Sequence, residues 1–448
     1  MDYEKTEKGI RVPNVIKRHR IAFMVLGVIL YVVIGALAPF MHYSPVSQSF
    51  QESFSAADIL EPEESPDRAM LLETNISAWE ERIRLMNMAS ERIILSTFDM
   101  RDGESTRDLL SVLLHKADEG VQVQILVDGF SDFLRMEGRP VFYALSSHPN
   151  VEIRIYNPIR PWFPWTLQGR MHDKYVIADD QAYILGGRNT FDYFIGDYET
   201  ENKSFDRELL IYNSKGPGES SLNGLMAYFQ EVRPDLFEPF DYAQVTEPTQ
   251  GVELLSGETG IYGKEPRVFY MLSQLMAHAQ EQVIIHTPYA VCNDYMYDTL
   301  TNLCAQVPDV TMMVNSVENG DNLVASSDYL KNKGHLIETG LEIYEYDGGI
   351  SYHGKSVVID NDISIVGSYN LDLRSTYMDT ELMLVVKSEA LTQELTGYME
   401  DMHQDCRKVI DARTYETPPH LDIARIPPAK RFFLGFLGIL LAPFRCVI

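Results

Sequence analysis

The sequence is poor in basic residues and in cysteine. Against 65 aspartates and glutamates it has 38 lysines and arginines, which gives a formal net charge of -27 at pH 7. Proteins that bind nucleic acid gather lysine and arginine to neutralise phosphates, so this balance disfavours a nucleic-acid partner. The four cysteines form no C-x-x-C pair and no cluster with zinc spacing. We therefore expect no metal site and no cofactor.

One stretch contains no charge at all. Residues 21–41, IAFMVLGVILYVVIGALAPFM, are uncharged, and as a helix they would cover roughly 31 Å, enough to cross a bilayer core. We prefer a retained transmembrane anchor to a cleaved signal peptide, because the run is long and Pro39 directly follows Ala-Leu-Ala, the candidate cleavage site. Lys17, Arg18 and Arg20 precede the run, which predicts a cytoplasmic N-terminus and an extracytoplasmic body.

A second apolar run lies near the other end of the chain. Residues 432–444 follow Lys430 and Arg431 and are too few to span a bilayer. This pattern favours a helix or hairpin that dips into the membrane interface, and a helix docked on the body is the alternative. The aromatic segment WFPW at 162–165 is open to the same two interpretations, interfacial seating or ordinary packing.

Between these ends, helical spacing alternates with short apolar strands. Apolar residues recur at helical spacing from Trp79 to Met86, and a buried strand follows at 93–95. A second helix ends at Gly120 and leads into a second strand. Such alternation indicates an α/β layer structure.

One polar motif occurs twice. In GRMHDKYVIADDQAYILGGRN (169–189), a histidine and a lysine precede a predicted hairpin, and YHGKSVVIDNDISIVGSYNLDLRS (352–375) repeats the pattern. In both copies a lysine lies two residues after the histidine, an aspartate seven, a glycine fourteen and an asparagine seventeen. The matched pairs are His172 and His353, Lys174 and Lys355, Asp179 and Asp360, Gly186 and Gly367, and Asn189 and Asn370. Chance does not produce four matched spacings between segments 181 residues apart.

The repeat continues on both sides of the motif. ERIILSTF resembles EQVIIHTPY upstream, and DRELLIYN around Glu208 resembles DTELMLVV around Glu381 downstream. We therefore expect two similar lobes of mixed sheets flanked by helices, related by a pseudo-two-fold axis that brings equivalent loops to one site. The predicted divisions are an N-terminus (1–20), an anchor (21–41), an acidic linker (42–75), lobe 1 (76–215), a connecting segment (216–265), lobe 2 (266–405) and a membrane-associating tail (406–448).

The paired side chains suit chemistry on a phosphodiester. One imidazole can attack phosphorus while the other protonates the leaving oxygen. Two lysines and two asparagine amides can bind the non-bridging oxygens. A carboxylate on a neighbouring strand, Glu208 or Glu381, can hold each histidine in one tautomer. Asp179 and Asp360 complete the motif, but their position in a turn favours a structural role over proton transfer.

The motif H-x-K-x(4)-D followed by G-G/S-x-N, present twice, resembles that of the phospholipase D superfamily. The resemblance implies a phosphohistidine mechanism with His172 as nucleophile and His353 as general acid and then base. It also implies that Lys174, Lys355, Asn189 and Asn370 bind phosphate. Ser368 stands where the family often has a phosphate-contacting serine, and Gly187 stands there in lobe 1. The histidine-orienting carboxylate carries over to Glu381, eleven residues after Asn370, whereas Glu208 lies nineteen after Asn189.

Within the superfamily, the chain resembles bacterial cardiolipin synthases, in particular those of the C-isoenzyme type. The segments that carry this likeness are RIYNP, GRMHDK, GGRN and VNSVENGDNLVASSDYLKNKGHLIETGLEIYEY. The resemblance implies an enzyme of the bacterial cell membrane that transfers a phosphatidyl group to phosphatidylglycerol. The donor it implies is phosphatidylglycerol or phosphatidylethanolamine, the product is cardiolipin, and no metal is needed.

Three other functions fit parts of the sequence. A phospholipase D-type hydrolase would use the same residues with water as acceptor, so no motif separates it from a transferase. A phosphodiesterase or nuclease of the superfamily is disfavoured by the acidic charge and the predicted anchor. A membrane-tethered binding protein with a dead site is disfavoured by two complete motifs.

Overall fold

The strands of each repeat form one large mixed sheet. The computed structural model describes residues 19–60, 65–200, 203–213, 220–228, 247–248, 250–258, 263–422 and 426–448. The first sheet has the order β4-β3-β2-β5-β6-β8-β1-β9, with strands β1 (Asp67–Leu72), β2 (Arg92–Thr97), β3 (Gln122–Asp128), β4 (Val151–Tyr156), β5 (Tyr175–Ala178), β6 (Ala182–Gly186), β8 (Glu208–Asn213) and β9 (Glu247–Pro248).

The second sheet repeats this arrangement and extends it. Its order is β10-β17-β16-β15-β11-β12-β13-β18-β19, with strands β10 (Gly251–Ser256), β11 (Gln282–His286), β12 (Asp309–Asn315), β13 (Glu342–Tyr346), β15 (Lys355–Ile359), β16 (Ile363–Gly367), β17 (Leu382–Lys387), β18 (Cys406–Val409) and β19 (Tyr415–Glu416). In both sheets three strands in βαβ connection are parallel and the motif hairpin, β5–β6 or β15–β16, is antiparallel. The expected fold of two α/β lobes with mixed sheets is confirmed.

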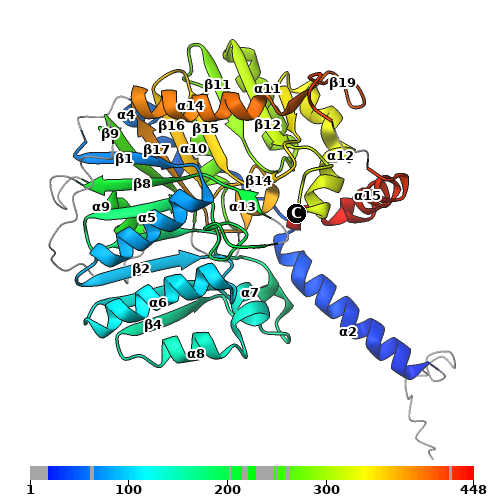
Figure 1. Ribbon diagram of the computed structural model, residues 1–448. Coiled ribbons are helices and arrows are strands. Elements are labelled where there is room, and N and C mark those ends of the chain that lie inside the picture. Colours follow the sequence, from blue (N-terminus) through cyan, green and yellow to red (C-terminus); the bar gives the residue numbers. More distant parts are fainter. Residues whose placement is uncertain are drawn as a thin grey trace, which may run out of the picture.

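The two sheets pack face to face, and helices cover their outer faces (Figure 1). One apolar cluster combines residues of both sheets, such as Ile177 and Leu209 with Val358 and Leu384. The outer cluster of lobe 1 lies under α5 (Asn75–Met88), α6 (Glu104–Asp118) and α8 (Pro140–Ser146). That of lobe 2 lies under α10 (Arg267–Met276), α11 (Asp294–Gln306) and α12 (Leu323–Glu338).

The lobes differ from the expected boundaries at their first strands. β1 begins before residue 76, and β10 lies within the expected connecting segment. Each of these strands pairs antiparallel with the last strand of its own repeat, β8 or β17. Sequence periodicity missed them because the helix–strand alternation starts only after them. The tail also adds β18 and β19 to the second sheet.

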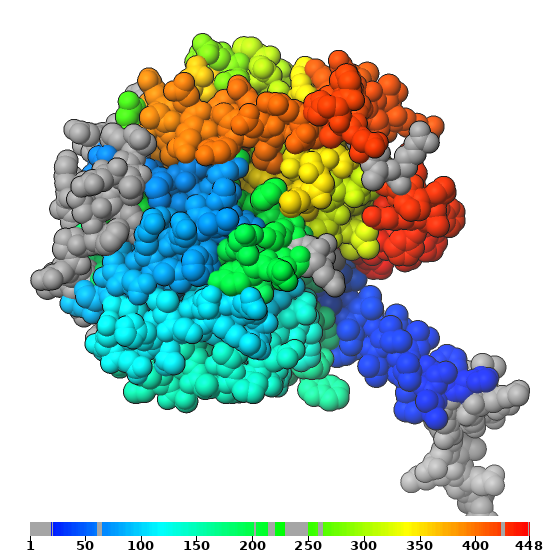
Figure 2. Space-filling view, viewed as in Figure 1, coloured from blue at the N-terminus to red at the C-terminus, as the bar shows by residue number. Residues whose placement is uncertain are grey.

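One apolar helix projects from the body (Figures 1 and 2). The segment Ile21–Phe40, most of it in α2 (Arg20–Leu37), is long and apolar enough to cross a membrane. The predicted cytoplasmic segment lies outside the described residues up to position 18. The aromatic segment 162–165 packs beside this helix and leads into η3 (Pro164–Leu167). Tyr31 of the helix donates a hydrogen bond to the Trp162 carbonyl at 2.7 Å.

The C-terminal apolar run forms α15 (Pro428–Leu441), followed by η6 (Ala442–Val447). One face of α15 packs on α12, where Gly438 fits because a Cβ would lie 2.7 Å from the Ser327 carbonyl oxygen. The other face is open, with Phe432 78% and Ile439 68% exposed. The helix is therefore docked on the body and still presents an apolar surface.

Candidate active site

Both motif histidines lie at the junction of the two lobes. His172 lies three residues before its hairpin and His353 lies two residues before its own. Each is held by a backbone hydrogen bond to the opposite repeat. The His172 amide donates to the Thr380 carbonyl at 3.3 Å, and the His353 amide donates to the Phe205 carbonyl at 2.7 Å. A two-stranded sheet of β7 (Ser204–Phe205) and β14 (Ser351–Tyr352) strengthens the second junction.

The carboxylate that contacts each histidine also comes from the opposite lobe. His172 Nδ1 lies 3.0 Å from Glu381 Oε1, and His353 Nδ1 lies 2.8 Å from Asp206 Oδ2. A carboxylate at Nδ1 favours the tautomer with the proton on that nitrogen, which leaves the Nε2 lone pair for chemistry. The two imidazoles are thus prepared in the same way by crossed partners.

The expected role of Glu208 is wrong, because its carboxylate faces away from both histidines. Arg82 donates two hydrogen bonds of 2.6 Å to Glu208, and Arg188 lies 3.5 Å away. Sheet register explains the error. Gly186 pairs with Glu208, whereas the equivalent Gly367 pairs with Met383, so the residue equivalent to Glu381 is Asp206.

The predicted phosphate contact of Ser368 is also revised. Its hydroxyl hydrogen-bonds to a carboxylate instead. Ser368 Oγ donates to Glu381 Oε2 at 2.5 Å and accepts from the Leu382 amide at 3.1 Å. In lobe 1 the equivalent position is Gly187, where a Cβ would lie 2.4 Å from Asp206 Oδ1. A serine would not fit beside the aspartate there.

Asp179 and Asp360 of the motif have the structural role that their position in a turn favours, and their carboxylates do not join the catalytic candidates. Each lies at the far end of the first hairpin strand with a positive φ of 56° or 49°. Each carboxylate accepts hydrogen bonds from three backbone amides in the turn that leads into a central strand. The donors to Asp179 are Ser90, Glu91 and Arg92, and the donors to Asp360 are Gln280, Glu281 and Gln282. These residues join the hairpin to its neighbour, as turn aspartates do.

The motif lysines are buried next to the histidines. Lys174 Nζ donates to the His172 carbonyl and Lys355 Nζ to the His353 carbonyl. Lys355 Nζ also lies 3.8 Å from Asp206 Oδ2. Burial lowers the pKa of Lys174 to about 7 and lowers that of Lys355. Two basic side chains therefore lie beside the two imidazoles.

The motif asparagines are held differently: the loop after β2 holds Asn189, and a residue five positions further along the chain holds Asn370. Asn189 Oδ1 accepts from the Asp99 amide at 3.1 Å. Asn370 is fixed through its backbone by Ser375, and its buried Oδ1 has no hydrogen-bond partner among the described residues. Neither asparagine Nδ2 bonds to a described residue, so both amide donors are free for a ligand.

Electrostatics distinguish the two histidines. Burial, then the Lys174 and Lys355 ammonium groups, hold the pKa of His172 well below its usual value. Burial also raises the pKa of Glu381 to about 8. Burial alone would raise the pKa of Asp206, but Lys355 and the His353 hydrogen bond lower it. His172 is accordingly neutral. Burial and the Lys355 ammonium also lower the pKa of His353, but there the hydrogen bond and the charge of Asp206 oppose the shift.

Sequence reasoning missed Asp206 and the residues that brace the segment before each histidine. Asp128 Oδ2 accepts from the Met171 amide at 2.7 Å, and Asn315 Oδ1 accepts from the Tyr352 amide at 2.9 Å. They are the last residues of the equivalent strands β3 and β12, where the repeated segments VDG and VNS align. That alignment could have indicated them.

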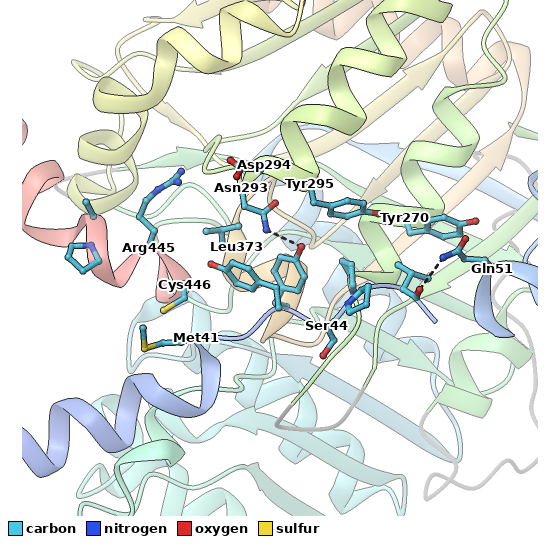
Figure 3. Close-up of a pocket in the computed structure, with 17 residues that line it drawn as sticks. Met41, Ser44, Gln51, Tyr270, Asn293, Asp294, Tyr295, Leu373, Arg445 and Cys446 are labelled. Atoms are coloured by element: carbon cyan, nitrogen blue, oxygen red, sulfur yellow. Dashed lines mark hydrogen bonds between the residues drawn. The ribbon is translucent and has the colours of Figure 1, made fainter. Parts of the chain in front are cut away.

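A separate cavity of about 800 Å³ lies where the chain leaves α2 (Figure 3). Its walls come from the segment after the anchor, from lobe 2 and from the C-terminal end, including Tyr43, Tyr270, Tyr377 and Arg445. The Arg445 charge is already paired with Asp328 at 2.6 Å. None of the motif residues lines this cavity. Within the described ranges, no group of three or more His, Cys, Asp or Glu could hold a metal ion.

Comparison with known proteins agrees with this geometry. The family model described as "Cardiolipin synthase, PLD-like domain" matches residues 83–203 and 272–403, together more than half of the chain. Cardiolipin synthase C of Escherichia coli (strain K12) is 26% identical over 401 residues, which are 72% of this chain and 82% of the relative. An uncharacterized protein of Helicobacter pylori is 23% identical over 427 residues, 78% of this chain and 82% of that protein.

A solved structure confirms the fold. The phosphatidylserine synthase of Haemophilus influenzae Rd KW20 superposes with a TM-score of 0.65 at 17% identity, covering 85% of this chain and 95% of that one. Two histidines, two lysines and two asparagines from repeated hairpins meet in the fold that these proteins share.

Proposed function

This chain belongs to the family of cardiolipin synthases with phospholipase D-like domains, and we propose that it transfers a phosphatidyl group to phosphatidylglycerol to make cardiolipin. The donor is phosphatidylglycerol or phosphatidylethanolamine. One observation carries the proposal: each motif histidine has a carboxylate of the other lobe at Nδ1, within 3.0 and 2.8 Å. A pair of imidazoles prepared in this way suits a double displacement at phosphorus.

In the first half-reaction, His172 Nε2 attacks the donor phosphorus and forms an N–P bond. The P–O bond to the donor headgroup breaks, and His353 gives its proton to the leaving alcohol. Lys174, Lys355 and the two asparagine amides stabilise the added negative charge on the non-bridging oxygens. In the second, the acceptor hydroxyl loses its proton to His353 and attacks phosphorus, and the N–P bond to His172 breaks.

The different surroundings of the histidines support this division of roles. The nucleophile must be neutral, and the pKa of His172 is held well below its usual value by burial and two lysines. The acid must carry a proton, and Asp206, charged at neutral pH, opposes the lowering of the His353 pKa by burial and Lys355.

We also propose that the enzyme is a single-pass protein of a bacterial cell membrane with both lobes on the extracytoplasmic face. The apolar helix and the open apolar face of α15 support membrane attachment. Lipid substrates then reach the site without leaving the bilayer.

The experiment that tests the function uses the full chain in vesicles of labelled phosphatidylglycerol, with and without phosphatidylethanolamine, followed by lipid separation. Cardiolipin with released glycerol or ethanolamine supports the proposal. Phosphatidic acid alone would instead assign a phospholipase D-type hydrolase. His172→Ala and His353→Ala should each abolish turnover, and substantial activity in either variant would refute the two-histidine mechanism.

A further inference from the structure

One buried lysine near the site lacks a partner. Lys264, just before α10, is only 4% exposed, and its Nζ has no hydrogen bond to any described residue. Other buried cations are paired, for example Lys333 with Glu345 at 2.7 Å and Arg82 with Glu208 at 2.6 Å. An unpaired buried ammonium is unfavourable, so its presence needs a reason.

The lysine belongs to an insertion that only lobe 2 has. β1 and α5 are joined by two residues, Glu73 and Thr74, and Glu73 pairs with Arg207. The equivalent strand and helix of lobe 2, β10 and α10, end at Ser256 and begin at Arg267, so their connection is much longer. Lys264 therefore breaks the pseudo-two-fold symmetry of the site.

The insertion begins beside the backbone of Glu381, the residue whose carboxylate contacts His172. The Gly257 amide donates to the Glu381 carbonyl at 3.1 Å. The acidic groups that act on Lys264 are, in order, Asp379, Asp173, Glu381 and Glu258, and burial lowers the lysine pKa to about 8. It still carries a charge at neutral pH, on the His172 side of the site.

A neighbouring group is also incompletely satisfied. Asp173 Oδ2 accepts from Thr380 Oγ1 at 2.8 Å, but its buried Oδ1 has no partner in the described part of the chain. An open donor on Lys264 and an open acceptor on Asp173 are thus close enough to interact electrostatically. Such a pair matches a ligand that carries both an anionic oxygen and a hydroxyl.

The repeated residues provide cations for one phosphate, the one that reacts. A phosphatidylglycerol acceptor brings a second phosphate together with the attacking hydroxyl, and that phosphate needs a cation of its own. Resting on the function proposed above, we infer that Lys264 binds the phosphate of the acceptor phospholipid beside His172. Lys264 thereby favours an anionic lipid over water or a simple alcohol as acceptor.

The test compares two acceptors with one donor. Vesicles of labelled phosphatidylglycerol with added ethanol yield cardiolipin and phosphatidylethanol from the same covalent intermediate. In Lys264→Gln, cardiolipin formation should fall about tenfold more than phosphatidylethanol formation, because one charge-assisted hydrogen bond is lost only with the anionic acceptor. Lys264→Arg should recover most of the difference. Lys203→Gln, which removes a partly exposed lysine paired with Asp197, is the matched charge control.

An equal loss with both acceptors, or no loss with either, would overturn the inference, because a lysine that only supports the fold affects both products alike.

Binding gives a measurement that needs no turnover. In a His172→Ala background, short-chain phosphatidylglycerol is titrated into the full chain by calorimetry, with and without Lys264→Gln. Affinity about tenfold weaker supports the role of Lys264, and unchanged affinity refutes it, even if the chain transfers no lipid.

Discussion

At the scale of single residues, two acidic side chains two positions apart have different tasks. Asp206 contacts His353, whereas Glu208 neutralises Arg82 and Arg188 inside lobe 1. Both are fully buried. The difference matters because only one of them can influence proton transfer, and the other can influence only folding.

This separation predicts opposite phenotypes for two similar substitutions. Asp206→Asn should lower kcat by about a hundredfold or more with an unchanged melting temperature, since the imidazolium loses its counter-charge. Glu208→Gln should lower the free energy of unfolding by about 3 kcal/mol or more, because Arg82 and Arg188 stay buried without a carboxylate. Turnover assays and thermal unfolding on both variants check this. Equal effects of the two substitutions on kcat would contradict it.

The buried cations predict a narrow pH range for activity. Because burial and two ammonium groups lower the pKa of His172, the acid limb of kcat/KM should lie below pH 6.5. Lys174, with its pKa lowered to about 7, loses its charge as the pH rises, so phosphate binding should weaken above neutrality. A profile from pH 5 to 9 in vesicles measures both limbs. Activity that keeps rising to pH 9 would contradict this assignment.

At the scale of elements, α15 has two faces with different surroundings. Gly438 allows close packing on α12, while Phe432, Phe436 and Ile439 are exposed on the open side. An exposed apolar strip on a docked helix favours attachment to a lipid surface. The helix can thus fix the orientation of lobe 2 relative to the bilayer.

Removing aromatic side chains from this face should weaken membrane association. Phe432→Ser with Phe436→Ser, in a chain lacking residues 1–41, should lower binding to phosphatidylglycerol vesicles about tenfold or more, because two large apolar side chains no longer leave water. Vesicle sedimentation measures the bound fraction. Tyr398→Ser, at an exposed aromatic residue of α14 (Glu389–His403), is the control. Equal binding by both variants would argue for a helix that only packs on the body.

At the scale of the whole molecule, the two lobes exchange parts. Lobe 2 provides Glu381 for His172, and lobe 1 provides Asp206 for His353. Neither repeat contains a complete histidine–carboxylate pair of its own. The packing of one sheet on the other is therefore a condition for chemistry as well as for stability.

This exchange predicts that the two crossed carboxylates affect different steps. The reaction with labelled donor lipid is stopped by denaturation at alkaline pH, because the N–P bond of a phosphohistidine breaks in acid. Glu381→Gln should reduce the covalent adduct on His172, since the nucleophile loses its orienting partner. Asp206→Asn should allow the adduct to accumulate when its breakdown by His353 is slowed more than its formation. His172→Ala gives the blank. If both variants changed the adduct in the same direction, the assigned roles would not hold.

The sequence by itself determined the repeat, the α/β class, the apolar helix and the six motif residues that could meet a phosphate. These depend on local spacing, since a histidine two residues before a lysine on a hairpin has the same meaning in either copy. Glu381 was also indicated, because it lies eleven residues after Asn370, where the family resemblance implies the histidine-orienting carboxylate.

Only the tertiary structure decided which carboxylate serves which histidine. That choice depends on sheet register and on contacts between lobes, and a shift of two residues leaves the alternation of a strand unchanged, so Glu208 and Asp206 are indistinguishable by pattern. The same reason applies to Lys264. Asp206 contacts His353 of the other lobe, and Lys264 interacts with Asp173 of the other lobe, so both relations arise only when the two sheets pack together.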